Sequence, residues 1–221
     1  MHVISVNIGK AQRFDAAKPA GRTGIFKHAV ATPVMVGSVG LAGDAICNTK
    51  HHGGPDQAVY VYGERDYAWW AAELGRVLES GTFGENITIA GFASAQAAIG
   101  DRLTLGEVTL EVTAPRIPCA TLARRMDDPD FIRKFREAER PGVYCRVIQA
   151  GLVQAGDAVS LLPYQGEAIT ILELFRDYYS RDRDRATIER FLAAPIAARA
   201  RSEKEAQLRK LLASLPGTTM A

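Results

Sequence analysis

The sequence predicts a mainly β fold with some α-helix, in which a strand-rich domain over residues 1–163 is followed by a small three-helix bundle over residues 167–215. Two observations predict this division. Up to about Pro163, short segments rich in valine, isoleucine and leucine alternate with glycine-containing turns, a pattern typical of barrels and sandwiches. After Gly166 the apolar residues take the spacing of helices. The 221 residues are enough for one full domain with a smaller appendage.

The predicted strands of the first domain cover residues 3–8, 33–39, 58–62 and 86–89, and further strands lie around 143–147 and 159–161. The clearest hairpin lies at residues 101–112. Its apolar side chains alternate on both sides of Gly106-Glu107, and they are Leu103, Leu105, Val108, Leu110 and Val112. A two-residue turn that begins with glycine favours type II′ geometry, so the segment predicts two antiparallel strands.

Two helices are predicted within the first domain, at residues 64–78 and 130–138, because aromatic and leucine side chains recur there at helical spacing. Phe131 and Phe135, four residues apart, mark the second. The three helices of the bundle are marked by Leu174, Phe175 and Tyr178, by Ile188, Phe191 and Leu192, and by Leu208, Leu211 and Leu212. Pro195 ends the second of these helices, and the third ends before Pro216.

The charged residues nearly balance, with 27 lysines and arginines against 25 acidic residues and a formal net charge of +2. This balance argues against nucleic acid or an anionic membrane as the main partner, so any anion site must be local. Three scattered cysteines are too few for a disulfide framework. No signal-like segment and no apolar run of about 18 residues is seen. We therefore expect a soluble, cytoplasmic protein that contacts no membrane.

One cysteine has an unusual setting. Cys119 follows the strand of the predicted hairpin, and Pro115 and Pro118 bracket Arg116 just before it. A thiolate and a permanent cation can therefore be presented together at a strand end, where they would suit a soft metal that carries an anionic cofactor. The alternative is a buried structural cysteine. Cys145 shares the spacing of its apolar strand and is predicted to lie in the core.

Three other segments carry polar groups that could bind a ligand. His52, Gly53 and Gly54 form a loop in which paired glycines let the backbone approach a phosphate or a pterin edge, although the same residues also suit an ordinary tight turn. Lys27 could bind a phosphate or lie on the surface. Asn86 could bind a heterocycle edge or its own turn. The neighbouring His51 is an additional imidazole to which we assign no role.

Taken in order, these motifs resemble a known family. They are Thr23-Gly24-Ile25-Phe26-Lys27, Gly40-Leu41-x-Gly43-Asp44, His52-Gly53-Gly54-Pro55-Asp56-x-Ala58, Phe83-Gly84-Glu85-Asn86 and Pro115-Arg116-x-Pro118-Cys119. Their order and spacing are similar to those of MOSC domain proteins of the YiiM-like subgroup. The resemblance spans roughly residues 1–163, and the remaining helices resemble the three-helix extension of that subgroup.

The resemblance implies a β-barrel-like fold that holds a molybdenum cofactor, the molybdopterin, with Cys119 as the protein ligand to molybdenum. It also implies that the pterin and phosphate are held by Lys27, His52, Gly53, Gly54, Asn86 and Arg116. Relatives with such a site reduce N-hydroxylated compounds, such as hydroxylaminopurines and hydroxylamines, to amines. His52 is then the expected proton donor.

The reduction needs two electrons, and the chain contains neither a cysteine-rich iron–sulfur motif nor a G-x-G-x-x-G fingerprint. A separate reductase is therefore the expected electron donor, with the three-helix extension either docking it or stabilising the first domain. An alternative function is a carrier of sulfur or of molybdenum cofactor that uses Cys119 as a persulfide or thiolate. A hydrolase that uses Cys119 with His52 is less favoured, because nothing orders a third group. The oligomeric state is left open.

Overall fold

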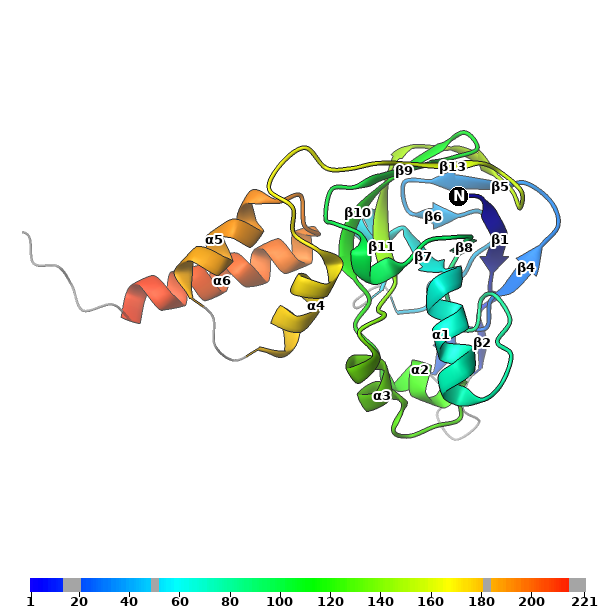
Figure 1. Ribbon diagram of the computed structural model, residues 1–221, viewed down its shortest axis with the longest axis horizontal. Helices are drawn as coiled ribbons and strands as arrows, with labels where there is room; N and C mark the ends of the chain where they lie inside the picture. Colours follow the sequence, from blue (N-terminus) through cyan, green and yellow to red (C-terminus); the bar gives the residue numbers. More distant parts are fainter. Residues whose placement is uncertain (14–20, 49–51, 181–183, 215–221) are drawn as a thin grey trace, which may run out of the picture.

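The computed structural model describes residues 1–13, 21–48, 52–180 and 184–214. Its largest sheet has eight strands in the order β13-β9-β10-β11-β7-β8-β1-β4 (Figure 1). In chain order these are β1 (Val3–Ile8), β4 (His28–Val30), β7 (Val59–Gly63), β8 (Ile87–Ile89), β9 (Arg102–Leu105), β10 (Val108–Pro115), β11 (Val143–Gln149) and β13 (Val159–Leu162). All neighbouring strands are antiparallel except β7 and β8, which are parallel.

Two small sheets complete the strands of the described chain. The first has the order β12-β5-β6, formed by β12 (Gly151–Val153), β5 (Val34–Gly37) and β6 (Gly40–Leu41). The second pairs β2 (Gln12–Arg13) with β3 (Arg22–Thr23). The predicted strands at 3–8, 33–39, 58–62, 86–89, 143–147 and 159–161 each correspond to an observed strand, some of them shorter than predicted.

The mixed, strand-rich fold is confirmed, but the sheet does not close into a barrel within the described residues. Its two edge strands, β13 and β4, do not pair with each other. The sheet curls only far enough for the start of β1 to meet the start of β13, where His2 and Ala158 form a single bridge. A closed barrel needs a continuous ladder between its first and last strands, and here β4 occupies the other side of β1.

The predicted hairpin is confirmed as β9 and β10, with Val108 opposite Leu105 and the turn at Gly106. Gly106 has φ +56°, the backbone region that glycine adopts most easily. The five alternating side chains of the hairpin are all fully buried. Cys145 on β11 is also fully buried in this core, as its spacing predicts.

The helices within the first domain pack beside the sheet around a cluster of buried aromatic side chains. The prediction of a helix over 64–78 was too long, because α1 (Glu64–Leu74) ends at Gly75, which takes the left-handed conformation with φ +62°. The prediction at 130–138 is confirmed by α3 (Phe131–Ala138). The short α2 (Ala120–Arg125) was not predicted. Trp70 of α1 packs against Phe131 and Phe135 of α3, with ring centroids 5.0 and 6.0 Å away.

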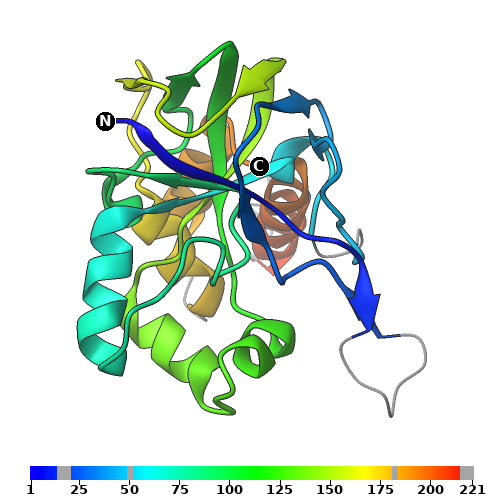
Figure 2. The same cartoon turned by 90° about the vertical axis from the view of Figure 1, so that its right-hand side faces the viewer.

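The three predicted C-terminal helices are α4 (Ile171–Tyr179), α5 (Arg185–Ala193) and α6 (Ala198–Ser214). They lie together beside β10 and β11 (Figure 1), and in the view of Figure 2, turned by 90°, they lie behind the sheet. Thr170 and Glu173 form a capping box at the start of α4. Ile171 and Phe191 are buried in the same core as the sheet. The helical extension is therefore packed onto the sheet rather than tethered to it.

None of the helices in the described ranges combines the length and the apolar character that crossing a bilayer requires.

Candidate functional site

Cys119 lies where β10 gives way to α2. The strand ends at Pro115, residues 116–118 form a short loop, and Cys119 is the residue that caps the start of α2, with extended backbone angles of φ −130° and ψ 166°. The side chain is only partly buried. Cys119 therefore lies just after the end of a strand, as the sequence predicts.

Arg116 is buried beneath this loop, with 4% of its surface exposed. Its Nη1 donates to the carbonyl oxygen of Phe83 at 2.7 Å, and its guanidinium lies over the ring of Tyr60, 5.0 Å from the centroid. Burial alone would lower the pKa of Arg116, but Tyr144, Tyr60 and Cys119 together raise it. Its buried Nε has no partner among the described residues. A fixed cation with an unused donor thus lies beside the thiol.

His52 connects the glycine loop to the thiol. Its Nδ1 lies 3.1 Å from the hydroxyl of Tyr144 on β11, and its ring also hydrogen-bonds Cys119. The Tyr144 contact fixes the orientation of the imidazole, so His52 can exchange a proton with a group bound at Cys119.

The environment of Cys119 favours the thiolate. Burial would raise the pKa of the thiol, but the hydrogen bond from His52 and the charge of Arg116 lower it to about 6. An ordinary cysteine has a pKa of about 8.5. Cys119 is therefore mostly ionised at neutral pH and able to act as a nucleophile or as a ligand for a soft metal.

This pKa predicts how alkylation of cofactor-free protein depends on pH. The rate at which iodoacetamide modifies Cys119 is expected to rise with a midpoint near pH 6, because only the thiolate reacts and it is lost as pH falls through the pKa. The His52→Ala variant should shift the midpoint upward, since the hydrogen bond that stabilises the thiolate is gone. Mass spectrometry of the Cys119 peptide measures both midpoints. A wild-type midpoint above pH 8 would contradict the prediction.

The glycine loop brings the backbone close to the site. Gly53 and Gly54 have φ of +79° and +85°, a conformation that other residues rarely adopt. A Cβ on Gly53 would lie 2.9 Å from Cγ2 of Ile46, so a side chain would also collide there. Gly53 lines a cavity beside Cys119, whereas Gly54 caps the short 3-10 turn η1 (Pro55–Gln57). The loop is thus both a tight turn and a cavity wall.

Two cavities meet at Cys119. The first, which we call the strand-side cavity, has a volume of about 260 Å³ and is lined by Lys27, Gly53, Asn86 and Arg116, with Thr23 and Gly24 among the others. The second, the helix-side cavity, has about 300 Å³ and lies between the sheet and helices α4 and α6. The cavities share the side chains of His52, Gln57, Cys119 and Tyr144. A group held in either cavity therefore lies next to the thiol.

Lys27 and Asn86 line the strand-side cavity, but both also bind Asp44. The ammonium of Lys27 pairs with the Asp44 carboxylate, and both side chains are nearly inaccessible to solvent. Asn86 Nδ2 donates to Asp44 Oδ2 at 2.9 Å, and Asn86 Oδ1 accepts from the backbone N–H of Tyr60 at 3.1 Å. Burial lowers the pKa of Lys27, against the effect of Asp44. These residues form a buried network in the wall of the cavity.

Sequence reasoning missed several residues of the site. Asp44 stood in the Gly43-Asp44 motif but was not assigned a role, and Tyr60 and Tyr144 were treated only as parts of strands. The contributions of α4 and α6 had no sequence signal, because their cavity residues are separated from Cys119 by more than fifty positions. His51 lies outside the described residues.

Among the described residues, no group of three or more histidine, cysteine, aspartate or glutamate side chains is placed to hold a metal ion.

Comparisons with known proteins identify the family. The MOSC domain model matches residues 48–160. The chain belongs to the MOSC domain family. Among curated MOSC relatives, the uncharacterized protein YflK of Bacillus subtilis is 34% identical over 191 residues, 86% of each chain. Protein YiiM of Escherichia coli is 32% identical over 162 residues, 72% of this chain and 71% of its own.

A third relative, from Gibberella moniliformis, carries the name Reductase. It is 34% identical over 146 residues, which are 63% of this chain but only 26% of that protein. Among solved structures, YiiM from Geobacillus stearothermophilus superposes with a TM-score of 0.78 at 27% identity and covers 94% of this chain and 98% of its own. This chain is a YiiM-like MOSC protein.

Proposed function

We propose that this MOSC protein is a molybdenum cofactor-dependent reductase that converts N-hydroxylated compounds, such as hydroxylaminopurines and hydroxylamines, to amines. One observation carries the proposal: an ionised thiol, Cys119, stands where two cavities meet. A cofactor and a substrate can then occupy opposite sides of the same sulfur. The name of the Gibberella moniliformis relative, Reductase, supports an oxidoreductase.

The residues of the strand-side cavity fit an anionic metal cofactor. The Cys119 thiolate is the soft donor that molybdenum accepts, and Arg116 offers a buried positive charge with an unused Nε donor. Gly53 leaves room for close approach to the backbone. In the proposal, the cofactor is held by Cys119 as metal ligand, with Lys27, His52, Gly53, Gly54, Asn86 and Arg116 around its pterin and phosphate. Lys27 and Asn86 act partly through the Asp44 network.

When bound, the cofactor supplies two-electron chemistry and a metal that can accept oxygen from an N–O bond. The protein supplies positioning and a proton. His52 is held by Tyr144 next to Cys119, so that its ring can deliver a proton to the departing oxygen or the product nitrogen. Arg116 stabilises negative charge at the sulfur through its buried guanidinium.

Electrons come from a separate reductase in this proposal, because the sequence contains no iron–sulfur or dinucleotide motif of its own. A reducing cytoplasm keeps the three cysteines as thiols. The sulfur or cofactor carrier is the second candidate, since it uses the same thiolate. The helix-side cavity favours the reductase, because a carrier needs no substrate space beside its sulfur.

The deciding experiment uses full-length protein from a host that makes the cofactor. Elemental analysis is expected to show near-stoichiometric molybdenum, and the protein should reduce N-hydroxylated purine with an artificial electron donor. Molybdenum-free protein with a persulfide on Cys119, seen by mass spectrometry, would support the carrier and contradict the reductase. Protein with molybdenum but without turnover of any hydroxylamine would contradict the proposed reaction.

A further inference from the structure

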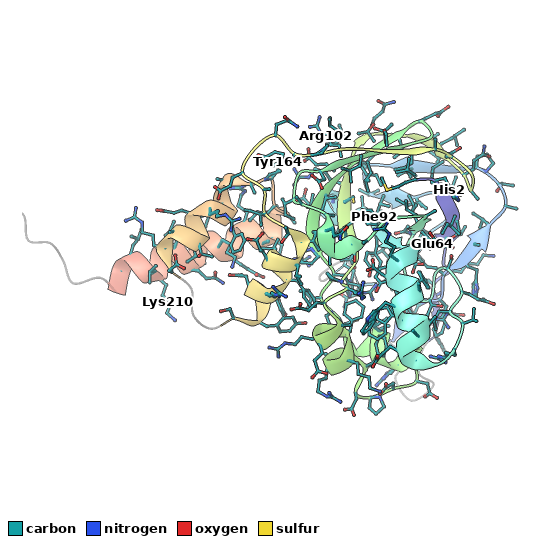
Figure 3. The ribbon with its side chains drawn as sticks, in the orientation of Figure 1. His2, Glu64, Phe92, Arg102, Tyr164 and Lys210 are labelled. Atoms are coloured by element: carbon teal, nitrogen blue, oxygen red, sulfur yellow. The ribbon has the colours of Figure 1, made fainter. Side chains whose placement is uncertain are left out.

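The helical extension forms one wall of the helix-side cavity. Residues of α4 and α6 line it together with Cys119, and they are Leu174, Asp177, Tyr178, Arg199, Ala200, Glu203, Lys204 and Gln207. The positive charge of Arg199 acts on Tyr144, whose pKa is raised chiefly by burial and lowered by Arg116 and Arg199. The part of α6 from Arg199 to Gln207 therefore lines the cavity that contains Cys119. Lys210 lies farther along α6, toward the end that points away from the sheet (Figure 3).

The charges in this wall balance. Lys204 pairs with Asp177 across α6 and α4, and both side chains are buried. Arg199 and Glu203 add one charge of each sign. The apolar side chains of Ala197, Ala200 and Leu174 line the same cavity. Such a lining favours an uncharged molecule that has flat apolar faces and hydrogen-bonding edges over a strongly anionic one.

Polar contacts of Asp56 and Arg146, which we call the clamp, hold the start of α6 against the loop of His52. Asp56 lies four residues after His52, and its Oδ2 accepts from the backbone N–H of Ala198, the first residue of α6, at 2.6 Å. Its Oδ1 lies 3.0 Å from Nε of Arg146 on β11. Arg146 Nη2 in turn donates to the carbonyl oxygens of Pro195 and Ile196 at 3.1 and 3.3 Å.

On the sheet side, hydrogen bonds of Thr113 hold the same segments in place. Thr113 on β10, fully buried, donates to the carbonyl oxygens of Asp56 and Tyr144 at 2.5 and 3.0 Å. Its own carbonyl accepts from the backbone N–H of Ala197 at 3.1 Å. The loop that carries His52, the strand that carries Tyr144 and the start of α6 are thus tied to one point of β10.

We propose that, in the helix-side cavity, Glu203 recognises the hydrogen-bond donors of the substrate, and that Asp56 positions α6 against Cys119. The substrate class rests on the proposed function. The extension is then part of the active site, and Asp56 is a positioning residue that touches no substrate. Adenine, the amine product of hydroxylaminopurine reduction, is a probe that needs no turnover.

The first test measures adenine binding to purified full-length protein by isothermal titration calorimetry. Wild-type protein is expected to bind one adenine. Glu203→Ala should weaken the Kd by about fivefold to tenfold, because a carboxylate acceptor is lost. Glu205→Ala is the matched control, since Glu205 is exposed on the same helix and does not line the cavity. Absence of wild-type binding, or equal Kd values for the Glu203 and Glu205 variants, would overturn the proposal.

The second test separates positioning by Asp56 from general stability. Asp56→Ala is expected to weaken the adenine Kd by about fivefold or more, whereas Asp56→Asn keeps an oxygen for the N–H of Ala198 and should recover part of the binding. Melting temperatures are recorded for both. Variants that lower the melting temperature while leaving the Kd unchanged would show a merely structural Asp56. If the protein contains no molybdenum or shows no turnover, the proposed reductase function is contradicted. The adenine Kd comparisons still test the roles of Glu203 and Asp56, because they need neither the cofactor nor turnover.

Discussion

Replacement of Cys119 by Ser or Ala is expected to abolish reduction of N-hydroxylated substrates, by more than about a thousandfold in kcat/KM, and to lower the molybdenum content of the purified protein. The reason is the donor chemistry. Neither replacement supplies the soft sulfur that the structure presents as a thiolate, ionised by His52 and Arg116. A serine hydroxyl is harder and stays protonated at neutral pH.

Cys47→Ser is the matched control. Cys47 is exposed at the rim of the strand-side cavity, so its replacement leaves the thiolate and its partners in place. This variant should retain molybdenum and most of the activity. Metal analysis and steady-state assays on both variants, with melting curves to show that each is folded, make the comparison. A Cys119→Ala protein with full activity would eliminate Cys119 as the metal ligand.

Lys27→Met is expected to destabilise the protein by about 3–5 kcal/mol, because it leaves the buried carboxylate of Asp44 without its cation. Asp44 also accepts from the backbone N–H of Gly9 and from Asn86. The loss of stability therefore affects the segments that carry these residues as well as that of Lys27. Urea denaturation of protein made without cofactor measures the change. The absence of cofactor in this experiment isolates the structural part of the role of Lys27.

Two further variants serve as controls for the change in unfolding free energy of Lys27→Met. Lys10→Met removes an exposed lysine of the same region and should change the free energy of unfolding by less than about 0.5 kcal/mol. Lys27→Met combined with Asp44→Asn should cost less than Lys27→Met alone, since no uncompensated charge remains. A loss below about 1 kcal/mol for Lys27→Met would mean that the ion pair contributes little and that Lys27 serves mainly in ligand binding.

The elements that depend on local spacing could be predicted. The hairpin of β9 and β10 followed from strict alternation of apolar residues, and Cys145 followed from the same rule on β11. The C-terminal helices followed from apolar spacing, and the structure adds a capping box at Thr170 that fixes the start of α4. The end of α1 was misplaced, because the apolar pattern continues to Leu78 while Gly75 ends the helix through its backbone conformation.

The sequence by itself determined that a cysteine, an arginine and two prolines lie together after a strand, because residues 115–119 are neighbours in the chain. Only the tertiary structure decided how they are used. It brought His52 and Tyr144 to the thiol from separate elements, paired Lys27 with Asp44, and placed α6 over a second cavity. These contacts join residues far apart in sequence, and local patterns do not encode such distances. The hydrogen bond from His52 and the charge of Arg116, acting against burial, therefore make Cys119 a thiolate with a cavity on each side.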